Sequence, residues 1–335
     1  MQHPEPDPRP GGALERVAVV VLNWNGWRDT VACLASLRNL HAVPHVIVVD
    51  NGSADGSGDR IRAAAPWVQF VQLPTNRGFA GGMNAGITAA LRDAPLVDYV
   101  WILNNDTLVE PATLSRMVAV ADSDSRIGIV GSRLVDADGS GRIQAMGGGT
   151  VNRWLGTTWT HLGPSSKPYD YLCGASLLVR RALLSRVGGF DERYFFYLED
   201  TDLGVRSRRA GWKLAAAQDA TVIHRRGASV DGGSPARSLR SDVYLARSSA
   251  IFVSGLDMPW RCTAIPLRLL GMLANRLARY QADRLIPLAR AYVDGLRIGR
   301  CLPEIPVFDD LEPTWPMALA GWHPARGSTE RSPRR

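Results

Sequence analysis

Short apolar runs alternate along residues 17–130 with segments whose apolar residues recur every three or four positions. Residues 17–22 and 46–49 are unbroken runs rich in valine, which is typical of strands covered on both faces. Residues 29–40, between them, carry valine and leucine at helical spacing. The alternation continues and predicts strands at 68–73, 99–103 and 127–130 and helices at 57–65, 80–92 and 111–120.

Strands that alternate with helices at this spacing predict an α/β fold with a doubly wound, mostly parallel sheet. In such sheets, ligands bind beyond the carboxyl ends of the strands. Polar side chains stand at four of these ends, namely Asn23, Asp50, Asn76 and Asp106. Strands end in polar loops, so one such residue means little. Four that converge on one edge favour a binding site there.

The pattern is less regular after residue 138. Residues 139–168 are dominated by Gly, Trp and Thr, which indicates irregular strands or a mobile loop. Beyond them, the sequence predicts strands at 171–180, 212–217 and 221–224. It predicts a short helix at 181–187 and a second helix that ends at residue 209. Two further helical segments are expected at 238–256 and 263–298, the latter broken by Pro266 and Pro287.

These elements divide the chain into consecutive parts. The N-terminus is rich in Pro and acidic residues and has no apolar run, so it is expected to be a disordered lead-in and not a signal peptide. The expected parts are the lead-in at 1–14, the α/β domain at 15–235 with halves at 15–135 and 136–235, a helical extension at 236–300 and a tail at 301–335.

Charge is distributed unevenly between these parts. The formal net charge is +7, from 39 Lys and Arg against 32 Asp and Glu. Residues 1–224 carry 22 basic and 22 acidic side chains, whereas residues 225–300 carry 13 Arg and 5 Asp. A coding bias explains why 37 of the 39 basic residues are Arg, but not why the excess lies in one segment. The surplus indicates an anionic surface or partner for the C-terminal helices.

Two classes of protein are disfavoured by simple counts. No apolar stretch reaches the roughly 18 uncharged residues that a membrane-spanning helix needs. The cysteines Cys33, Cys173, Cys262 and Cys301 include no CxxC pair. That spacing argues against a disulfide scaffold or a structural zinc site and fits a reducing cytoplasm.

Two loops after the early strands suit a nucleotide ligand. Asp50, with Asn51 and Ser53 behind it, suits a ribose hydroxyl or a base N–H, although the same residues form ordinary turns. The glycine-rich segment that begins at Asn76-Arg77-Gly78 suits a phosphate, although glycines also permit tight packing. The first strand is not followed by G-x-G-x-x-G, which disfavours a nicotinamide-dependent dehydrogenase.

Carboxylates and a histidine follow the later elements. Asn104-Asn105-Asp106 suits a hard cation that shares a diphosphate, or is simply a polar turn. Glu199, Asp200 and Asp202 lie within aromatic sequence, so burial and mutual repulsion should raise at least one pKa and prepare a proton acceptor. A helix start decorated with acids is the alternative. His224 is a candidate metal ligand only because a cation site is expected nearby.

In this order and spacing, the motifs of residues 17–224 resemble glycosyltransferase family 2 with its GT-A fold, above all the bacterial branch of cell-wall and O-antigen rhamnosyltransferases. Each motif is weak alone, whereas the ordered set is specific. The matching text is Val20-Val-Leu-Asn-Trp-Asn25, Val48-Val-Asp-Asn-Gly-Ser53, Asn76-Arg-Gly-Phe-Ala-Gly-Gly82 with Asn84, Leu103-Asn-Asn-Asp106, Cys173-Gly-Ala-Ser176 through Arg180-Arg181, Gly189-Phe-Asp-Glu192, Tyr197-Leu-Glu-Asp-Thr-Asp-Leu203 and His224.

The resemblance implies roles for these residues. Asp50 and Arg77 would contact a pyrimidine base near the Asn23–Trp24 edge, and Asp106, the last residue of the family's DXD motif, would bind Mg²⁺ or Mn²⁺ with His224. Asn104 replaces the first Asp of that motif, and Met83 stands where many relatives have Asn. The donor site would also include Asn51, Ser53, Gly78, Asn104 and Asn105; the acceptor side would include Gly174, Ala175 and Asp202; and Asp200 would be the general base, with Glu199 the less favoured candidate.

The implied activity is an inverting, metal-dependent transfer of a sugar from a nucleotide-diphosphate donor to an acceptor hydroxyl. The branch favours L-rhamnose from dTDP-L-rhamnose, a glycan or lipid-linked acceptor, cell-wall or surface polysaccharide assembly, and a cytoplasmic location at the inner face of the membrane. Three alternatives remain. They are another dTDP- or UDP-sugar with a soluble natural-product acceptor, a non-catalytic nucleotide-sugar binding protein, and a nucleotidyltransferase, although a Gly-rich loop after the first strand is lacking.

The C-terminal helices leave two readings open. Residues 263–298 interleave leucine with arginine, which suits peripheral contact with an anionic membrane. The same pattern suits a helical pair packed on the catalytic domain or on a second subunit in a homodimer. Nucleic-acid binding is disfavoured because aromatic residues are sparse in this segment.

Overall fold

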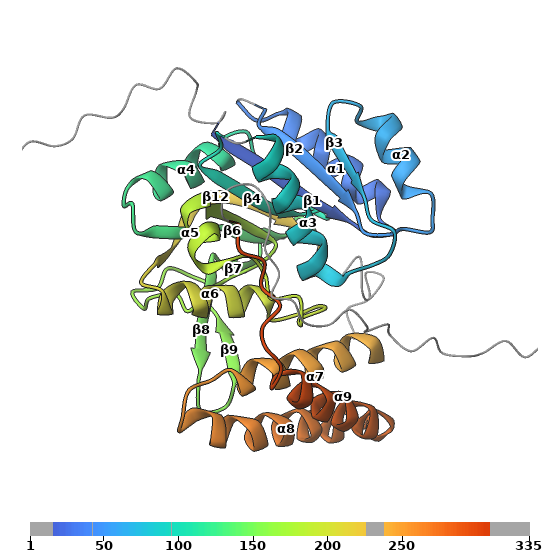
Figure 1. The fold of residues 1–335 in the computed structure, drawn as a ribbon, viewed down its shortest axis with the longest axis vertical. Coiled ribbons are helices and arrows are strands. Elements are labelled where there is room, and N and C mark those ends of the chain that lie inside the picture. Colours follow the sequence, from blue (N-terminus) through green and yellow to red (C-terminus); the bar gives the residue numbers. More distant parts are fainter. Residues whose placement is uncertain (1–15, 42, 95, 226–237, 309–335) are drawn as a thin grey trace, which may run out of the picture.

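The computed structural model describes residues 16–308 except 42, 95 and 226–237. The expected lead-in at 1–14, the boundary at 235–236 and the tail beyond 308 therefore lie outside the described residues. The chain forms an α/β body with a layer of long helices beneath it (Figure 1). No helix among the described residues is both long enough and apolar enough to cross a membrane.

The N-terminal half of the main sheet is parallel, as predicted. Strands β2, β1 and β4 pair side by side, and β3 continues the sheet at its edge. In this register, Asn23 at the end of β1 lies opposite Asp50 at the end of β2. The bounds are β1 Val17–Asn23, β2 His45–Asp50, β3 Gln69–Gln72 and β4 Tyr99–Asn104.

Antiparallel strands enter in the second half of the sheet. Strand β11 runs antiparallel to both β4 and β6, while β12 is parallel to β6. The predicted α/β architecture is confirmed, with this mixed half added to it. The remaining bounds of this sheet are β5 Thr107–Val109, β6 Ile127–Asp136, β7 Ile143–Met146, β11 Ser176–Arg180 and β12 Lys213–His224.

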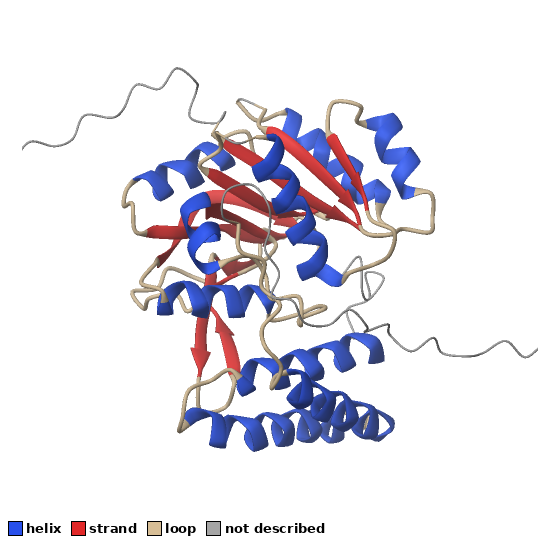
Figure 2. Ribbon diagram, viewed as in Figure 1, coloured by secondary structure: helices blue, strands red, loops and turns tan. Residues whose placement is uncertain are grey.

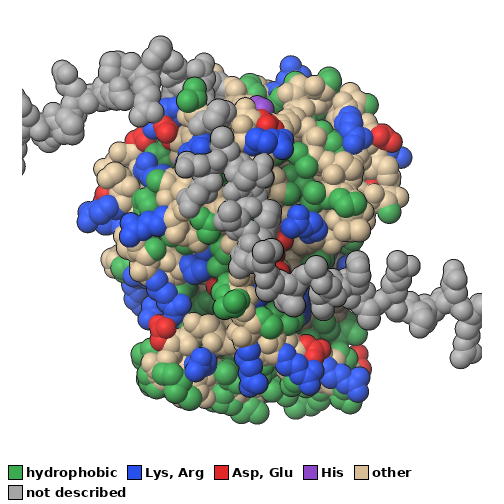
Figure 3. Space-filling view, in the orientation of Figure 1, with side chains coloured by type: hydrophobic (Ala, Val, Ile, Leu, Met, Phe, Trp, Pro, Cys, Tyr) green, Lys and Arg blue, Asp and Glu red, His purple; other side chains and the backbone are tan. Residues whose placement is uncertain are grey.

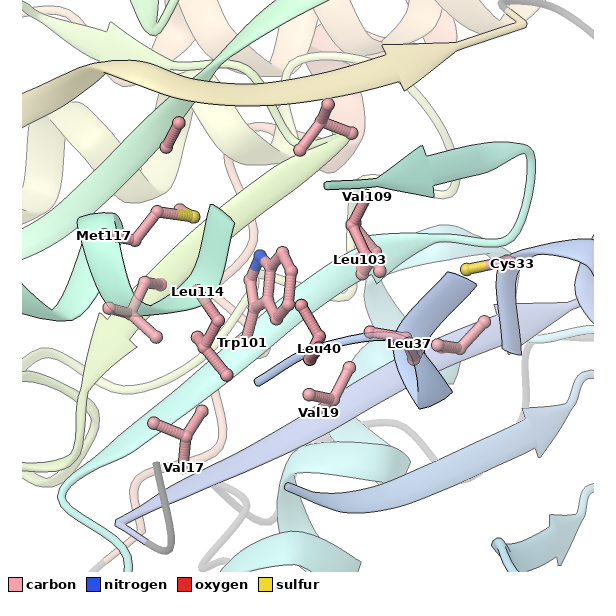
Figure 4. Close-up of a cluster of buried hydrophobic side chains, with 14 of the residues drawn as sticks. Val17, Val19, Cys33, Leu37, Leu40, Trp101, Leu103, Val109, Leu114 and Met117 are labelled. Atoms are coloured by element: carbon pink, nitrogen blue, oxygen red, sulfur yellow. The ribbon is translucent and has the colours of Figure 1, made fainter. Parts of the chain in front are cut away.

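Helices cover both faces of the sheet (Figure 2). Along β1, Val17 and Val19 face one core with α1 and α4, and Val20 faces the other with α3 and α5. This alternation explains the unbroken valine run, because every position is buried. Figure 4 shows Trp101 of β4 among the side chains of the first core. The helices are α1 Trp27–Arg38, α2 Ser57–Ala64, α3 Gly78–Asp93, α4 Thr113–Asp122, α5 Arg181–Val187 and α6 Glu199–Arg209.

Residues 139–168 include strands, the first of the two expected alternatives, and β8 and β9 among them form a second sheet with β10. The structure corrects three other predicted elements. The strand predicted at 171–180 is split at residues 173–175 into β10 and β11, and the two strands predicted at 212–224 are the single strand β12 with irregular register after Ala217. Helix α4 begins two residues after Pro111. The second sheet consists of β8 Gly148–Asn152, β9 Thr157–Thr160 and β10 Tyr171–Leu172.

Three helices form the lower layer, namely α7 Leu239–Ser254, α8 Trp260–Ala278 and α9 Leu285–Ile298. Pro266 lies inside α8 and does not end it, which corrects the predicted break. The chain turns instead at Tyr280, whose φ is +55°. Pro287 occupies the first turn of α9, where a missing N–H costs nothing. The layer has a core of its own, centred on α7.

Residues 301–308 run back from α9 to the α/β body and hydrogen-bond to it. The N–H groups of Gly189 and Glu192 donate to the carbonyls of Pro306 and Glu304, at 2.9 Å each. Phe308 is buried in the second core. This return segment holds the helical layer to the body at a second point.

Candidate active site

A closed network of hydrogen bonds joins the carboxyl ends of β1 and β2. The Asn23 amide donates to Asp50 Oδ1 at 2.6 Å, and Gln72 Nε2 donates to Asp50 Oδ2 at 2.6 Å. The Ser53 hydroxyl also donates to Asp50. Thr30 donates to Asn23 Oδ1 at 2.8 Å. Asp50 is therefore a buried anchor whose two oxygens are both occupied within this edge.

Asn51 fixes the glycine-rich loop that precedes α3. Its Nδ2 donates to the Gly78 carbonyl at 2.9 Å and to Asn76 Oδ1 at 3.1 Å, and its Oδ1 accepts from the Arg77 N–H at 2.9 Å. Gly78 has φ +73°, and a Cβ there would lie 2.3 Å from the Phe195 carbonyl oxygen. This close approach requires glycine and binds the two halves of the site together.

Arg77 and Trp24 both contact segments that are distant in the sequence. Arg77 Nη2 donates to Glu192 Oε2 at 2.7 Å. Trp24 lies under the guanidinium of Arg240, whose Cζ is 5.3 Å from a ring centroid, and Arg240 belongs to α7. Tyr244 of α7 stacks on Phe195 at 5.1 Å. The first turns of α7 thus lie beside the edge formed by the carboxyl ends of β1 and β2.

A cavity of about 330 Å³ opens beside this edge, between β4, β6, β7, β9 and the start of α6. Asn104, Gly174 and Ala175 line it, and so do Asp200 and His224. Four elements therefore bring into one cavity residues that the sequence assigns separately to the donor, the acceptor and the metal. The rest of the lining is Phe79, Leu134, Gln144, Ala145, Thr160, Cys173, Phe196 and Glu199.

Asp200 and Glu199 differ sharply in their partners. Asp200 accepts from the Gly174 N–H at 2.8 Å and from the Thr201 N–H at 2.6 Å. Glu199 Oε2 is buried without a hydrogen-bond partner among the described residues. Burial raises the pKa of both carboxyls, and the Asp200 charge raises the pKa of Glu199 further, while the two N–H donors oppose the rise at Asp200. Of the two carboxyls, Glu199 therefore holds its proton more strongly than Asp200 does.

The backbone before α6 is held in an uncommon conformation. Tyr197 and Leu198 are consecutive residues with φ of +73° and +67°, a region that side chains other than glycine seldom occupy. Ser248 of α7 donates to the Phe196 carbonyl at 2.8 Å and helps to fix this turn. After this turn α6 begins, and its first two residues, Glu199 and Asp200, line the cavity.

His224, which lines the cavity, lies next to Asp106. His224 Nε2 is 3.4 Å from Asp106 Oδ1. Gln144 Nε2 donates to Asp136 Oδ1 at 2.5 Å and to the His224 carbonyl at 2.7 Å, so its Oε1 must face His224 Nδ1, 2.8 Å away. That acceptor assigns the hydrogen to Nδ1. In the neutral ring, Nε2 then turns a lone pair towards the Asp106 carboxylate, an arrangement that a cation would relieve.

The side chains of Asp106 and His224 fit a divalent cation that is also bound by a ligand. Among the described residues, no three His, Cys, Asp or Glu side chains gather as a complete metal site. Asp106 and His224 supply one oxygen and one nitrogen. Mg²⁺ and similar ions are commonly held by one or two protein ligands together with substrate phosphates. The hydrogen bond between His224 Nδ1 and Gln144 Oε1 is of the type that fixes the ring of metal-binding histidines.

Comparison with known proteins places these residues in a family. Residues 18–187 match the family model described as Glycosyl transferase family 2. The chain belongs to glycosyl transferase family 2. It is also 32% identical to the N-acetylglucosaminyl-diphospho-decaprenol L-rhamnosyltransferase of Mycobacterium tuberculosis over 253 residues, which cover 69% of this chain and 81% of the relative.

Solved structures support the same fold for this family 2 enzyme. The mannosyltransferase PcManGT from Pyrobaculum calidifontis, in complex with GDP-Man and Mn²⁺, matches with a TM-score of 0.54 at 18% identity, covering 84% of this chain and 87% of that one. S. aureus TarS 1–349 with UDP-GlcNAc matches with a TM-score of 0.54 at 17% identity, covering 84% and 82%. The fold is GT-A, and the family identifies a transferase that takes a sugar from a nucleotide donor.

Several predicted residues of the family 2 enzyme make structural contacts. Asn105 turns its amide away from the cavity to Thr30 Oγ1, at 3.0 Å. Asp202 pairs with Arg206 at 2.6 Å, one turn along α6. Gly174 and Ala175 do lie beside Asp200 and Asn104, because the Gly174 N–H donates to Asp200 and the Ala175 carbonyl accepts from the Asn104 N–H at 3.0 Å.

Sequence reasoning missed residues that the fold brings to the site. Gln144 lies in the segment without a clear pattern, and Arg240 lies in the basic extension, so neither carried a local signal. Glu192 belongs to the Gly-Phe-Asp-Glu motif and could have been proposed as the partner of Arg77. Opposite charges in two motifs of one site were the available signal.

Proposed function

We propose that this protein is a metal-dependent, inverting glycosyltransferase that moves L-rhamnose from dTDP-L-rhamnose to a hydroxyl of a lipid-linked glycan in surface-polysaccharide assembly. The observation that carries the proposal is the cavity that Asp200, held by two N–H donors, lines together with Asn104 and His224. The rhamnose donor is supported by the relative that transfers L-rhamnose, at 32% identity.

Asp200 acts as the general base. Its raised pKa makes it a stronger base than an exposed aspartate, and the N–H groups of Gly174 and Thr201 fix its orientation. The acceptor oxygen forms a bond to the anomeric carbon as its proton passes to Asp200. The bond from that carbon to the diphosphate breaks on the opposite face, so the anomeric configuration inverts in one displacement.

The other residues hold the donor. The edge built on Asp50 and Asn23 receives the nucleotide, with Trp24 beside it, and the ordered loop at Arg77–Gly78 lies next to this edge. Asp106 and His224 Nε2 would hold a divalent cation, with Gln144 fixing the histidine. When bound, Mg²⁺ or Mn²⁺ would neutralise charge on the departing diphosphate.

The test is a screen of nucleotide sugars with the full chain in the presence of Mg²⁺ or Mn²⁺. The melting temperature and the release of nucleoside diphosphate are measured for dTDP-L-rhamnose, UDP-GlcNAc and GDP-mannose. We expect the largest stabilisation with dTDP-L-rhamnose. NMR of the transferred sugar should show an inverted anomeric centre.

Three results would change the proposal in different ways. A preference for UDP-GlcNAc would keep the class and replace the sugar. Retention of the anomeric configuration would remove Asp200 from its role as base for a direct displacement. Stabilisation by nucleotide sugars without turnover on any hydroxyl acceptor, lipid-linked or soluble, would make the protein a binding module.

A lipid-linked acceptor implies that the reaction takes place at the inner face of the cell membrane. Support comes from the relative whose name specifies a decaprenol-linked substrate. We include this location in the proposal.

A further inference from the structure

The outer side of the helical layer carries apolar side chains that no part of the described chain covers. On α8, Leu267, Leu270 and Leu277 are exposed at spacings of three and seven residues, which places them on one helical face. Leu270 is 60% exposed, and Ile286 on α9 is 65% exposed. Exposed leucines in a contiguous row are uncommon on a protein that has no partner for them.

The inner side of the same helices is packed against α7. Ala264 and Met272 of α8 and Leu288 and Tyr292 of α9 pack with α7 in the core of the layer. The leucines of α8 therefore divide into two sets, and Leu269 and Leu273 belong to the inner one. Packing within the core of the layer accounts for the inner set and leaves the outer set without a structural purpose.

The arginines of the layer divide in the same way. Arg276 and Arg284 turn inward and share the buried Asp242, at 2.5 and 2.7 Å. Arg261, Arg279 and Arg290 are exposed and form no ion pair among the described residues. Residues 238–300 hold ten Arg and four Asp, so the layer carries a net charge of ten minus four, or +6.

The two outer sets lie on the same end of the molecule. Figure 3 shows apolar side chains along its lower edge and a row of Lys and Arg side chains above them, in the region where Figure 1 places α8 and α9. Tyr280, 98% exposed, projects from the turn between these helices. An apolar stripe bordered by arginine, with a tyrosine at its end, is the composition of a surface that lies in the headgroup region of a bilayer.

We propose that the outer face of α8 and α9, defined by Leu267, Leu270, Leu277, Ile286 and Arg290, binds the surface of an anionic lipid bilayer. Charge decides between a bilayer and a second copy of the chain. In a symmetric dimer the same unpaired arginines would face each other, whereas anionic headgroups neutralise them. This binding does not depend on the sugar or the acceptor and stands apart from the proposed transfer.

Co-sedimentation of the full chain with vesicles tests the proposal. Vesicles of phosphatidylcholine with one part in three phosphatidylglycerol are compared with pure phosphatidylcholine, at low and high salt. We expect binding to the anionic vesicles and its loss at high salt. Leu270→Glu should lower the affinity by about tenfold or more, and Arg290→Ser by about fivefold.

Matched controls use exposed residues of the α/β body. Leu96→Glu changes an exposed leucine, and Arg186→Ser removes an arginine that has no ion pair among the described residues. Both should bind vesicles like the unchanged protein. Melting temperatures and sedimentation velocity accompany every variant, because they report folding and self-association directly.

Two outcomes would overturn the proposal. One is equal binding of Leu270→Glu and Leu96→Glu to the anionic vesicles, or no binding by the unchanged protein. The other is a dimer that dissociates in Leu270→Glu, which would assign the face to a second copy of the chain. Release of nucleoside diphosphate without vesicles, measured in parallel, keeps a failure of the transfer proposal separate from a failure of this one.

Discussion

The proposed nucleotide edge, at the ends of β1 and β2, and the cavity lined by Asp200 differ in how far their polar groups are satisfied. At the edge, Asp50, Asn51 and Asn23 form hydrogen bonds with one another and with their own loops. In the cavity, Glu199 Oε2 has no partner among the described residues, and His224 Nε2 faces a carboxylate. Buried polar groups are normally paired, so unpaired ones indicate where something else binds.

This difference in hydrogen bonding suggests that the edge is already formed before a ligand binds, whereas the cavity is not. Under the proposed function, the edge would give the donor a fixed surface, which would lower the entropy lost on binding. A cation and the substrates would then complete the cavity, whose unsatisfied groups are kept in place by the fold around them. Substitutions in the two regions should therefore change different measurements.

The largest effect is expected from Asp200→Asn. Removing the base should lower kcat by about 10² to 10⁴-fold with an unchanged melting temperature, since general-base catalysis contributes that much. Because burial raises the pKa of Asp200, the acid limb of the pH profile of the unchanged enzyme should lie above the range of an ordinary aspartate. Activity should then fall about tenfold per pH unit below that limb, as the base becomes protonated.

Asp202→Asn is the matched control, two residues further along α6. It breaks the pair with Arg206 and leaves the cavity intact. Stability should drop slightly and kcat should not. Near-native turnover by Asp200→Asn would contradict the assignment, as would an equal loss of kcat in Asp202→Asn.

A smaller effect is expected from Gln144→Leu. Loss of the acceptor for His224 Nδ1–H should weaken Mn²⁺ binding by about 10- to 100-fold, the usual cost of removing such an orienting partner. Titration of Mn²⁺ followed by electron paramagnetic resonance, with dTDP present, measures this without turnover.

The chain contains a second histidine–glutamine pair that serves as the control. His45 and Gln69 are 2.8 Å apart on the exposed edge of β2 and β3. Gln69→Leu should leave Mn²⁺ affinity unchanged. If Gln144→Leu and Gln69→Leu bind Mn²⁺ equally well, Gln144 does not orient His224 for metal binding.

Within the nucleotide edge, Asn51→Ala should mainly reduce stability. It removes three hydrogen bonds to the Asn76–Gly78 loop and leaves buried groups unpaired, at a cost of about 2 kcal/mol in the free energy of unfolding. Urea denaturation measures the change, with the exposed Asn275→Ala as control. KM for the donor should rise more than kcat falls. A lower kcat at unchanged stability would place Asn51 in the cavity's chemistry instead.

The smallest effect on turnover is expected from Glu199→Gln, because the amide resembles the protonated acid that the raised pKa of Glu199 favours. The acid limb of the pH profile of activity, which the pKa of Asp200 sets, should not shift. The raised pKa of Glu199 means that the folded protein keeps a proton which the unfolded chain loses above the ordinary range of a glutamate. The unchanged protein therefore loses stability as pH rises through that window, and the variant does not.

Melting temperatures from about pH 4 to about pH 8 check this sign. The variant should match the unchanged protein at the acid end and exceed it at the alkaline end. A large loss of turnover in Glu199→Gln would make Glu199, and not Asp200, the proton acceptor.

Much of the first half of the fold could be predicted because its strands are buried on both faces. The valine run of β1 cannot be stable as an exposed helix, and its polar end at Asn23 marks the edge where ligands bind. Parallel register then places Asp50 beside Asn23, as the contact of 2.6 Å confirms. Local pattern and long-range pairing agree in this part of the chain.

The rest of the site depends on contacts that no local pattern contains. Gln144 reaches His224 only because β7 and β12 flank the same strand, β6. Asn105 and Asp106 are neighbours in one turn, yet one amide points to Thr30 and the other side chain to His224. Arg240 reaches Trp24 from a helix more than two hundred residues later. Such placements follow from tertiary packing and not from spacing.

The return segment at residues 301–308 has a mechanical consequence. A body attached at one point can swivel, whereas one attached at several separate points cannot. The helical layer contacts the α/β body through Tyr244 and Ser248 of α7 and through the segment ending at Phe308. With the outer face of α8 and α9 resting on a bilayer, Asp200 would stand at a constant height above the lipids. The enzyme would then select acceptors by the distance of their hydroxyl from the lipids as well as by the chemistry of that hydroxyl.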